Sequence, residues 1–442
     1  MNTLNRRRVL LVAAAATAGL MVLAGCTPLE EGDGATSGDG IKFSAGVTEE
    51  ACPNAVNADN GCIYLGVLSD LTEGPFAALA VPLTDGQRAF WKQVNEAGGI
   101  GGFDVDIDTY TRDTKYQAAE HAAAYQEIES SILAIAQSLG TVNTQGVLAD
   151  MNKADIIAAP ASWWSGYNFA ESDEGIILQN GYSYCTEAML GLDWMSSAFT
   201  KPTKVAAVGY PGDYGGDSAA GVQRWADANG ATVTAIPTGP NQITGNQDAV
   251  VAAVMAAQPE AVVLAIGPAE TAEIVGKLAG SGFKGRFLGS LPTWNPALLG
   301  SAAAPALVGL YNHMSPFDMW DGDSQGIADI KASLGGELPS NHGYVIGWAS
   351  SYPILAVLQK AAKNGDLTRA GVRAAIDGLT VSYAGMIKDM NYSLTGSDTP
   401  STEVTISAPD SNVELGLKTV ASFFTGTTFS EAEYTSACSA LS

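Results

Sequence analysis

The clearest chemistry in this 442-residue chain belongs to its five cysteines. Cys26 directly follows residues 23–25 (Leu-Ala-Gly), which close an apolar run that begins after the arginines at residues 6–8. The run is about 15 residues long, shorter than the ~20 that a membrane-spanning helix needs, so the alternative of a transmembrane anchor is disfavoured. The pattern predicts a cleaved leader, residues 1–25, and a thiol at Cys26 that is acylated after cleavage.

Four cysteines remain for the exported chain, namely Cys52, Cys62, Cys185 and Cys438. An even number in an oxidising compartment favours two disulfides, although four cysteines allow three connectivities. Cys52 and Cys62 enclose a short polar stretch, which favours a local bond and leaves Cys185 to pair with Cys438. A structural zinc site is the alternative, but the chain has no CxxC spacing and no histidine near these cysteines.

Catalytic signatures are sparse. The histidines are His121, His313 and His342, and the chain contains no GxSxG, HExxH or P-loop motif. We therefore expect no enzyme, no cofactor and no metal, although a carboxylate pair hidden among 46 acidic residues would escape this search. The formal net charge of −24 becomes more negative once the leader is removed, and such a surface disfavours nucleic-acid partners.

Short apolar runs alternate with longer amphipathic segments in two blocks. The expected strands are 63–68, 105–110, 131–136, 156–159, 204–208, 232–236, 261–266 and 286–288. The expected helices are 84–97, 114–129, 144–153, 216–229, 247–257 and 269–281, the first of them starting at a capping box at Thr84. Residues 27–47 are mostly polar, which predicts a flexible tether. The pattern predicts an α/β fold of two lobes, each a doubly wound parallel sheet.

Five motifs carry a resemblance to a known family: residues 63–68 (IYLGVL), 71–75 (LTEGP), 94–102 (VNEAGGIGG), 111–114 (TRDT) and 209–215 (GYPGDYG). They resemble the type I periplasmic substrate-binding proteins of ABC importers, in the branched-chain amino-acid (leucine)-binding family. The resemblance implies a three-strand hinge, with crossings between the lobes near Asn180, near Tyr311 and around residues 384–398. After the leader (1–25) and the tether and disulfide loop (26–61), it implies lobe 1 from 62–183 and 312–384, and lobe 2 from 184–311 and 385–442.

Candidate ligand-binding residues follow strands, because open α/β sheets bind ligands beyond the carboxyl ends of their strands. The loop after residue 136 offers Thr141 and helix-start amides for a polar group. Two consecutive tryptophans, Trp163 and Trp164, stand on another such loop. Together with the positions implied by the resemblance, the candidates are Phe76, Leu79, Leu139, Thr141, Ala161, Ser162, Trp163, Trp164, Tyr214, Gly267, Leu291, Trp294 and Tyr344.

One position departs from the family pattern. Leu291 stands where amino-acid binders place the acidic residue that pairs with the ligand ammonium, and a buried ammonium without a partner is costly. Asp213 or Glu270 could replace that partner. The sequence therefore favours an organic acid or amide with an apolar body, with branched-chain amino acids as the runner-up.

The resemblance implies a monomer that is lipid-anchored at the outer face of the cytoplasmic membrane. It would capture a small solute between its lobes and deliver it to an ABC permease. The alternative is an extracellular sensor that presents the same fold to a signalling partner.

Overall fold

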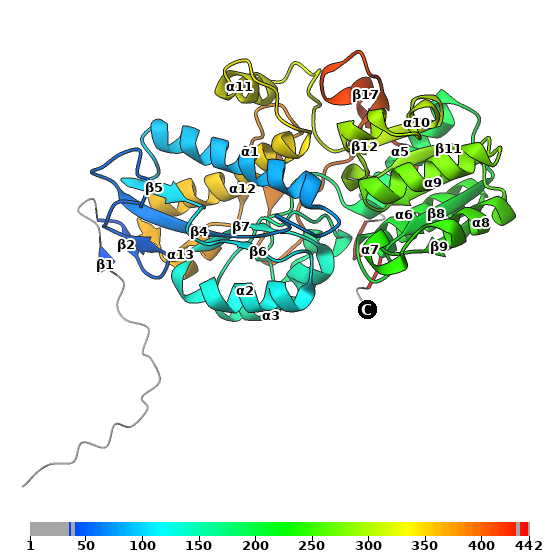
Figure 1. The fold of residues 1–442 in the computed structure, drawn as a ribbon. Coiled ribbons are helices and arrows are strands. Elements are labelled where there is room, and N and C mark those ends of the chain that lie inside the picture. The colour runs from blue at the N-terminus through cyan, green and yellow to red at the C-terminus, as the bar shows by residue number, and fades with distance from the viewer. Residues whose placement is uncertain (1–34, 37–39, 430–433, 441–442) are drawn as a thin grey trace, which may run out of the picture. The chain divides into compact units, whose positions relative to one another are not determined.

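The computed structural model of the chain describes residues 35–36, 40–429 and 434–440. The predicted leader, residues 1–25, and the predicted lipidation site Cys26 lie outside these residues. Within the described part, two large β-sheets with their helices form the centres of two lobes (Figure 1). Among the described residues, no helix is both long and apolar enough to cross a membrane.

Lobe 1 is organised around the long buried strand β4. This strand pairs in parallel with β5, β6 and β7 and antiparallel with β3. The strands are β3 (Val47–Thr48), β4 (Gly61–Ser69), β5 (Phe103–Asp106), β6 (Thr111–Asp113) and β7 (Ala134–Ser138). Two small sheets complete the lobe: β1 (Ala35–Thr36), β2 (Lys42–Phe43) and β13 (Asp366–Leu367), and β14 (Leu379–Val381) with β15 (Met390–Tyr392).

Helices cover both faces of this sheet. Helices α1 and α12 pack together on one side, and α2 and α3 pack together on the other (Figure 1). The helices of lobe 1 are α1 (Ala77–Glu96), α2 (Ala118–Ile128), α3 (Thr141–Lys153), α4 (Ala170–Asp173), α11 (Gln325–Ser333), α12 (Gly343–Lys363) and α13 (Arg369–Ala374), with the 3-10 turns η1 (Glu129–Ser131) and η2 (Ser165–Asn168). The fold therefore brings α12, from late in the chain, beside the first helix.

Helix α1 begins at Ala77, so the predicted start at Thr84 is wrong. The carboxylate of Asp70 accepts hydrogen bonds from the amides of Gly74 and Phe76, and this turn sets the start of the helix. Pro82 lies inside the helix and has no amide to donate. The Ala78 carbonyl, which would have accepted that hydrogen bond, accepts instead from the side chain of Asn341 at 2.6 Å.

The predicted tether is also too long. Ile41, Phe43 and Val47 are buried, and β2 pairs with β13. Alternate apolar side chains in an otherwise polar stretch were enough to attach this segment to lobe 1.

Lobe 2 is a seven-stranded sheet in the order β17-β16-β12-β11-β10-β8-β9. Its strands are β8 (Lys204–Gly209), β9 (Thr232–Pro237), β10 (Ala261–Ala265), β11 (Arg286–Gly289), β12 (Tyr311–Ser315), β16 (Glu403–Pro409) and β17 (Leu417–Thr425). Its helices are α5 (Tyr184–Ala198), α6 (Tyr214–Asn229), α7 (Asn241–Thr244), α8 (Asp248–Ala257), α9 (Pro268–Gly280) and α10 (Ala304–Leu310), with η3 (Leu291–Thr293), η4 (Pro296–Gly300) and η5 (Glu414–Gly416).

The inner strands of lobe 2 are buried on both faces, whereas the edge strands β9 and β17 are partly exposed. In β8, Val205 and Ala207 belong to the hydrophobic cluster under α5 and α6, whereas Ala206 and Val208 belong to the cluster on the opposite face. This burial explains the continuous apolar runs in the sequence. The sheet is mixed rather than wholly parallel, because the chain returns through β16 and β17 as an antiparallel pair beside β12.

The connections between the lobes lie close together. The amide of Ser401 donates to the carbonyl of Gly181, and a side chain at Gly181 would collide with Pro316. Gly181 also has φ of +89°, a conformation that favours glycine. Strand β12 runs to Ser315 and pairs with β16, so the chain stays in the sheet of lobe 2 beyond the crossing expected near Tyr311.

Both disulfides have the predicted connectivity. Cys52 is bonded to Cys62 in lobe 1, and Cys185 at the start of α5 is bonded to Cys438 near the C-terminus. The second bond joins residues that are 253 positions apart in the sequence.

Candidate ligand-binding site

A cavity lies between loops of the two lobes. Its walls come from the carboxyl ends of strands in both sheets and from α1 and α12 of lobe 1. The described residues that line it are Phe76, Leu79, Leu83, Tyr116, Leu139, Gly140, Thr141, Ala161, Trp163, Tyr184, Tyr214, Leu291, Pro292 and Ile346. None of these fourteen side chains carries a charge.

Aromatic rings form a continuous wall across the two lobes. The ring of Phe76 in lobe 1 lies 6.1 Å from that of Tyr214 at the start of α6. The Tyr214 ring lies 4.9 Å from that of Tyr184, which lies 6.0 Å from that of Trp163. Trp163 in turn donates its indole N–H to Asn180, next to a crossing segment. The wall is therefore fixed at the junction of the lobes.

One end of the cavity is polar. The hydroxyls of Thr141 and Ser162 are hydrogen-bonded to each other at 2.7 Å, and Thr141 begins α3. Gly140 precedes it with φ of +98°, and a side chain there would collide with Tyr116 and Asn143. The hydroxyl of Tyr214 is buried and has no hydrogen-bond partner among the described residues. A buried hydroxyl of this kind is available to a ligand oxygen, since leaving it unpaired is costly.

A hydrogen bond joins the lobes beside the cavity. The hydroxyl of Tyr116 in lobe 1 donates to the carboxylate of Asp213 in lobe 2 at 2.6 Å. Lys115 and Tyr116 have φ of +51° and +59°, a strained conformation for residues other than glycine. The Asp113 carboxylate holds this turn by accepting from the amides of Leu71 and Lys115.

Buried carboxylates near the cavity already have protein partners. Asp213 accepts from the amide of Tyr214 as well as from Tyr116, and burial raises the pKa of Asp213 despite these bonds. Glu270 accepts from the hydroxyl of Tyr210 and the amide of Asn241.

Glu187, on α5, supports the loop that carries Leu291. It accepts from the hydroxyl of Tyr182 and from the amide of Leu291, each at 3.0 Å. Burial raises the pKa of Glu187 to about 8, so a large fraction of it is protonated at neutral pH. Leu291 itself lines the cavity with an apolar side chain.

The structure brings eight of the thirteen candidate residues into the lining of the cavity: Phe76, Leu79, Leu139, Thr141, Ala161, Trp163, Tyr214 and Leu291. Ser162 lies directly behind Thr141, to which it is hydrogen-bonded. Whether any of them binds a ligand stays a prediction.

Four candidates do not line the cavity. Trp164 turns away and packs on Tyr167, and Trp294 stacks on Tyr311. The Gly267 amide donates to the hydroxyl of Tyr210. The backbone of Tyr344 packs against Gly86 where α12 meets α1, and Ile346, further along α12, lines the cavity instead.

Six lining residues were not among the candidates predicted from the sequence: Leu83, Tyr116, Gly140, Tyr184, Pro292 and Ile346. Leu83 was missed because α1 was expected to start after it. Gly140 and Pro292 are next to candidates and could have been included on that ground. Tyr116 and Ile346 gave no local signal, because only the tertiary fold brings them to the strand ends.

Among the described residues, no group of three or more histidine, cysteine, aspartate or glutamate side chains could hold a metal ion. Burial lowers the pKa of His121 and His342 to about 4 and that of His313 to about 3, so all three are neutral at pH 7. None of them lines the cavity.

Two α/β lobes with an uncharged cavity between their strand ends define a solute-binding protein of the two-lobed type. A family model described as periplasmic binding protein matches residues 63–407. The chain belongs to this family, whose members bind solutes rather than transform them, and its type I fold is that of ABC-importer substrate-binding proteins. No curated protein sequence matches the chain significantly.

Solved structures show the same fold. A fatty acid ABC transporter substrate-binding protein from Thermomonospora curvata is 26% identical with a TM-score of 0.79, and the match covers 89% of this chain and 97% of that one. A branched-chain amino acid ABC transporter protein from Thermus thermophilus, with bound valine, is 20% identical (TM-score 0.70; 85% and 99% covered). A solute-binding protein from Rhodopseudomonas palustris HaA2, in complex with p-hydroxybenzoic acid, is 16% identical (TM-score 0.68; 84% and 100% covered).

Proposed function

We propose that this protein captures a small organic acid or amide with an apolar body and delivers it to an ABC permease, without chemical turnover. The observation that carries the proposal is the lining of the cavity, which is aromatic and aliphatic and has no charged side chain. Burying an apolar body the size of a leucine or phenylalanine side chain contributes roughly 2–3 kcal/mol.

The polar end of the ligand would lie at Thr141, near Ser162 and the hydroxyl of Tyr214. Amides at the start of α3 add a favourable partial charge for an oxygen atom. The nearby carboxylates are poor partners for an ammonium group, because Asp213 and Glu270 already accept protein hydrogen bonds and Leu291 replaces the family's acidic residue. This disfavours α-amino acids.

Ligands of the similar proteins support this choice of chemical class. The protein from Thermomonospora curvata is described as a fatty acid binder, and the one from Rhodopseudomonas palustris HaA2 holds p-hydroxybenzoic acid. Both ligands pair a carboxyl group with an apolar body.

The experiment is a native mass-spectrometry screen of the purified mature protein. The panel contains 4-methylpentanoate, octanoate, 4-hydroxybenzoate, isovaleramide and leucine. Retention of an acid or the amide, with no retention of leucine, supports the proposal. Retention of leucine alone would contradict it.

The proposal also places the protein at the outer face of the cytoplasmic membrane, held by a lipid on Cys26. The basis is the leader sequence. One acyl chain alone binds a membrane only weakly, whereas the two acyl chains of a diacylated cysteine give a stable anchor. We expect Cys26→Ser to move the protein from the membrane fraction to the supernatant. Sedimentation of the variant with membranes, at the level of the unchanged protein, would contradict the anchor.

A further inference from the structure

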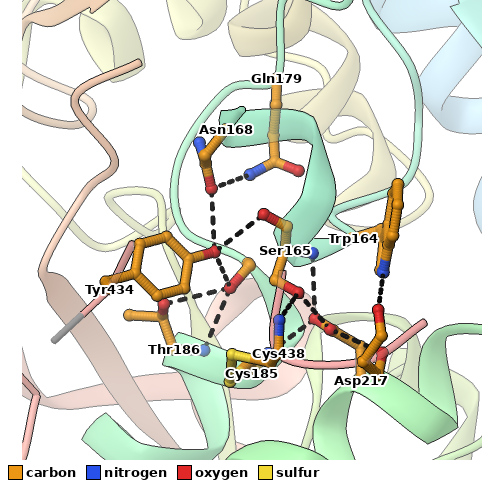
Figure 2. Close-up of a disulfide and its surroundings, with 11 residues drawn as sticks. Trp164, Ser165, Asn168, Gln179, Cys185, Thr186, Asp217, Tyr434 and Cys438 are labelled. Atoms are coloured by element: carbon orange, nitrogen blue, oxygen red, sulfur yellow. Dashed lines mark hydrogen bonds between the residues drawn. A yellow bond between two sulfur atoms is a disulfide. The ribbon is translucent and has the colours of Figure 1, made fainter. Parts of the chain in front are cut away.

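The C-terminal strap, residues 434–440, is attached to both lobes behind the aromatic wall of the cavity. Cys438 is bonded to Cys185 on α5 of lobe 2, and the amide of Cys438 donates to the hydroxyl of Ser165 in lobe 1 at 2.8 Å. Figure 2 shows the disulfide at the centre of this cluster, with Trp164, Ser165 and Asp217 around it.

Tyr434 begins the strap and is buried. Its hydroxyl lies 3.1 Å from both the Ser165 carbonyl and the Asn168 side-chain oxygen, and 3.0 Å from the Ser183 hydroxyl (Figure 2). Ser183 caps α5 by accepting from the amide of Thr186. One hydroxyl of the strap therefore connects the loop of lobe 1 to the first turn of α5.

Asp217 on α6 completes the attachment. Its fully buried carboxylate accepts from the amide of Ser165, the amide of Cys185 and the hydroxyl of Ser439 at 3.0–3.1 Å. The indole N–H of Trp164 donates to the Ser439 carbonyl at 3.0 Å. Each of these groups has a partner on another segment, so the cluster is tied together at several points.

The residues held by the strap flank two residues of the cavity wall. Trp164 and Ser165 follow Trp163, whereas Ser183 and Cys185 lie on either side of Tyr184. The amide of Tyr184 donates to the Trp163 carbonyl at 2.8 Å, and their rings are in edge contact. The strap thus fixes the backbone directly behind the Trp163–Tyr184 pair.

We propose that the C-terminal strap is a positioning element of the binding site, which holds Trp163 and Tyr184 in place and thereby raises ligand affinity. This inference rests on the proposed function for the chemistry of the ligand. A wall that is already ordered before binding loses less conformational entropy when the ligand is bound, and so binds more tightly.

Two changes to the strap test this, with a matched control. Cys185→Ser/Cys438→Ser removes the disulfide of the strap, and Tyr434→Phe removes only its hydroxyl. Cys52→Ser/Cys62→Ser removes the other disulfide, whose residues do not line the cavity. All variants are compared in the full mature chain, at a temperature well below their unfolding midpoints.

Affinity is measured by calorimetry with 4-methylpentanoate or octanoate, whichever binds the unchanged protein more tightly. We expect the strap variants to bind about tenfold more weakly, chiefly through faster dissociation, and the control to bind unchanged. Equal affinity in the strap variants, or an equal loss in the control, would overturn the inference.

Hydrogen–deuterium exchange separates this inference from the proposed function, because it needs no ligand. We expect faster exchange of residues 163–169 and 183–186 in both strap variants and not in the control. If exchange is unchanged, the strap does not position the wall. If exchange rises while the unchanged protein binds no member of the panel, the proposed ligand class is wrong and the positioning role stands.

Discussion

At the scale of single residues, Trp163 combines two tasks. Its ring forms part of the cavity wall, and its indole N–H is hydrogen-bonded to Asn180 at a crossing between the lobes. A ligand packed on this ring would therefore contact a group that is fixed at the junction. Large aromatic side chains in such places commonly dominate binding.

Trp163→Ala should weaken the binding of 4-methylpentanoate at least about tenfold, which corresponds to about 1.4 kcal/mol. The reason is the loss of apolar contact area with the ligand. Trp294→Ala is the matched control, because Trp294 is buried against Tyr311 and does not line the cavity. Calorimetry should show weaker binding only for the first variant. Equal affinities of Trp163→Ala and the unchanged protein would mean that Trp163 does not contact the ligand.

At the scale of elements, Asp213 connects the start of α6 in lobe 2 to the turn before α2 in lobe 1. It precedes α6 and accepts from the amide of Tyr214, and it also accepts from Tyr116 in the turn before α2 of the other lobe. In the proposed account Asp213 holds the lobes together and has no ammonium to bind.

Asp213→Asn removes the negative charge and keeps one side-chain oxygen, which can accept from the amide of Tyr214, while its NH2 group can donate to the hydroxyl oxygen of Tyr116. We expect 4-methylpentanoate to bind this variant at least as tightly as the unchanged protein, because one like charge beside the ligand carboxylate is removed. Titration calorimetry of the two proteins checks this. A loss of more than about tenfold would instead indicate that the charge of Asp213 is needed by the ligand.

The sequence was informative where local patterns determine structure. Alternating βα units predicted both lobes, since a strand buried on both faces must be apolar, as β8 and β10 are. Thr141 was predicted at the cavity because it lies just beyond the end of a strand, at the start of the next helix. The sequence could not predict that Trp164 turns away from the cavity or that Ile346 lines it. The direction of a loop side chain and the packing of a distant helix are set by tertiary contacts.

At the scale of the whole molecule, buried titratable groups link stability to pH. Burial raises the pKa of Glu187 and of Asp398 to about 8. Up to that pH the folded state holds protons that the unfolded chain has lost, so the free energy of unfolding falls as pH rises. The three buried histidines act in the opposite direction, but only below their ordinary value of 6.5.

Between pH 6.5 and 8 the histidines no longer contribute to this balance and the buried carboxyl groups do, among them Asp173, whose pKa burial raises well above its ordinary value. We expect each of Glu187 and Asp398 to lower the free energy of unfolding by about 1 kcal/mol per pH unit. Urea denaturation across this range measures the slope, and Glu187→Gln should reduce it because the amide does not titrate. A stability that is constant or rises from pH 6.5 to 8 would mean that these groups are ionised in the folded protein.

The central claim is that the cavity selects an apolar body with an oxygen-bearing head and does not recognise an ammonium group. Isothermal titration calorimetry with leucine and with 4-methylpentanoate, which lacks only the amino group, tests it most directly. The account predicts that 4-methylpentanoate binds the purified mature protein more tightly than leucine by at least about tenfold, or about 1.4 kcal/mol. Tight binding of leucine with no binding of 4-methylpentanoate would contradict it.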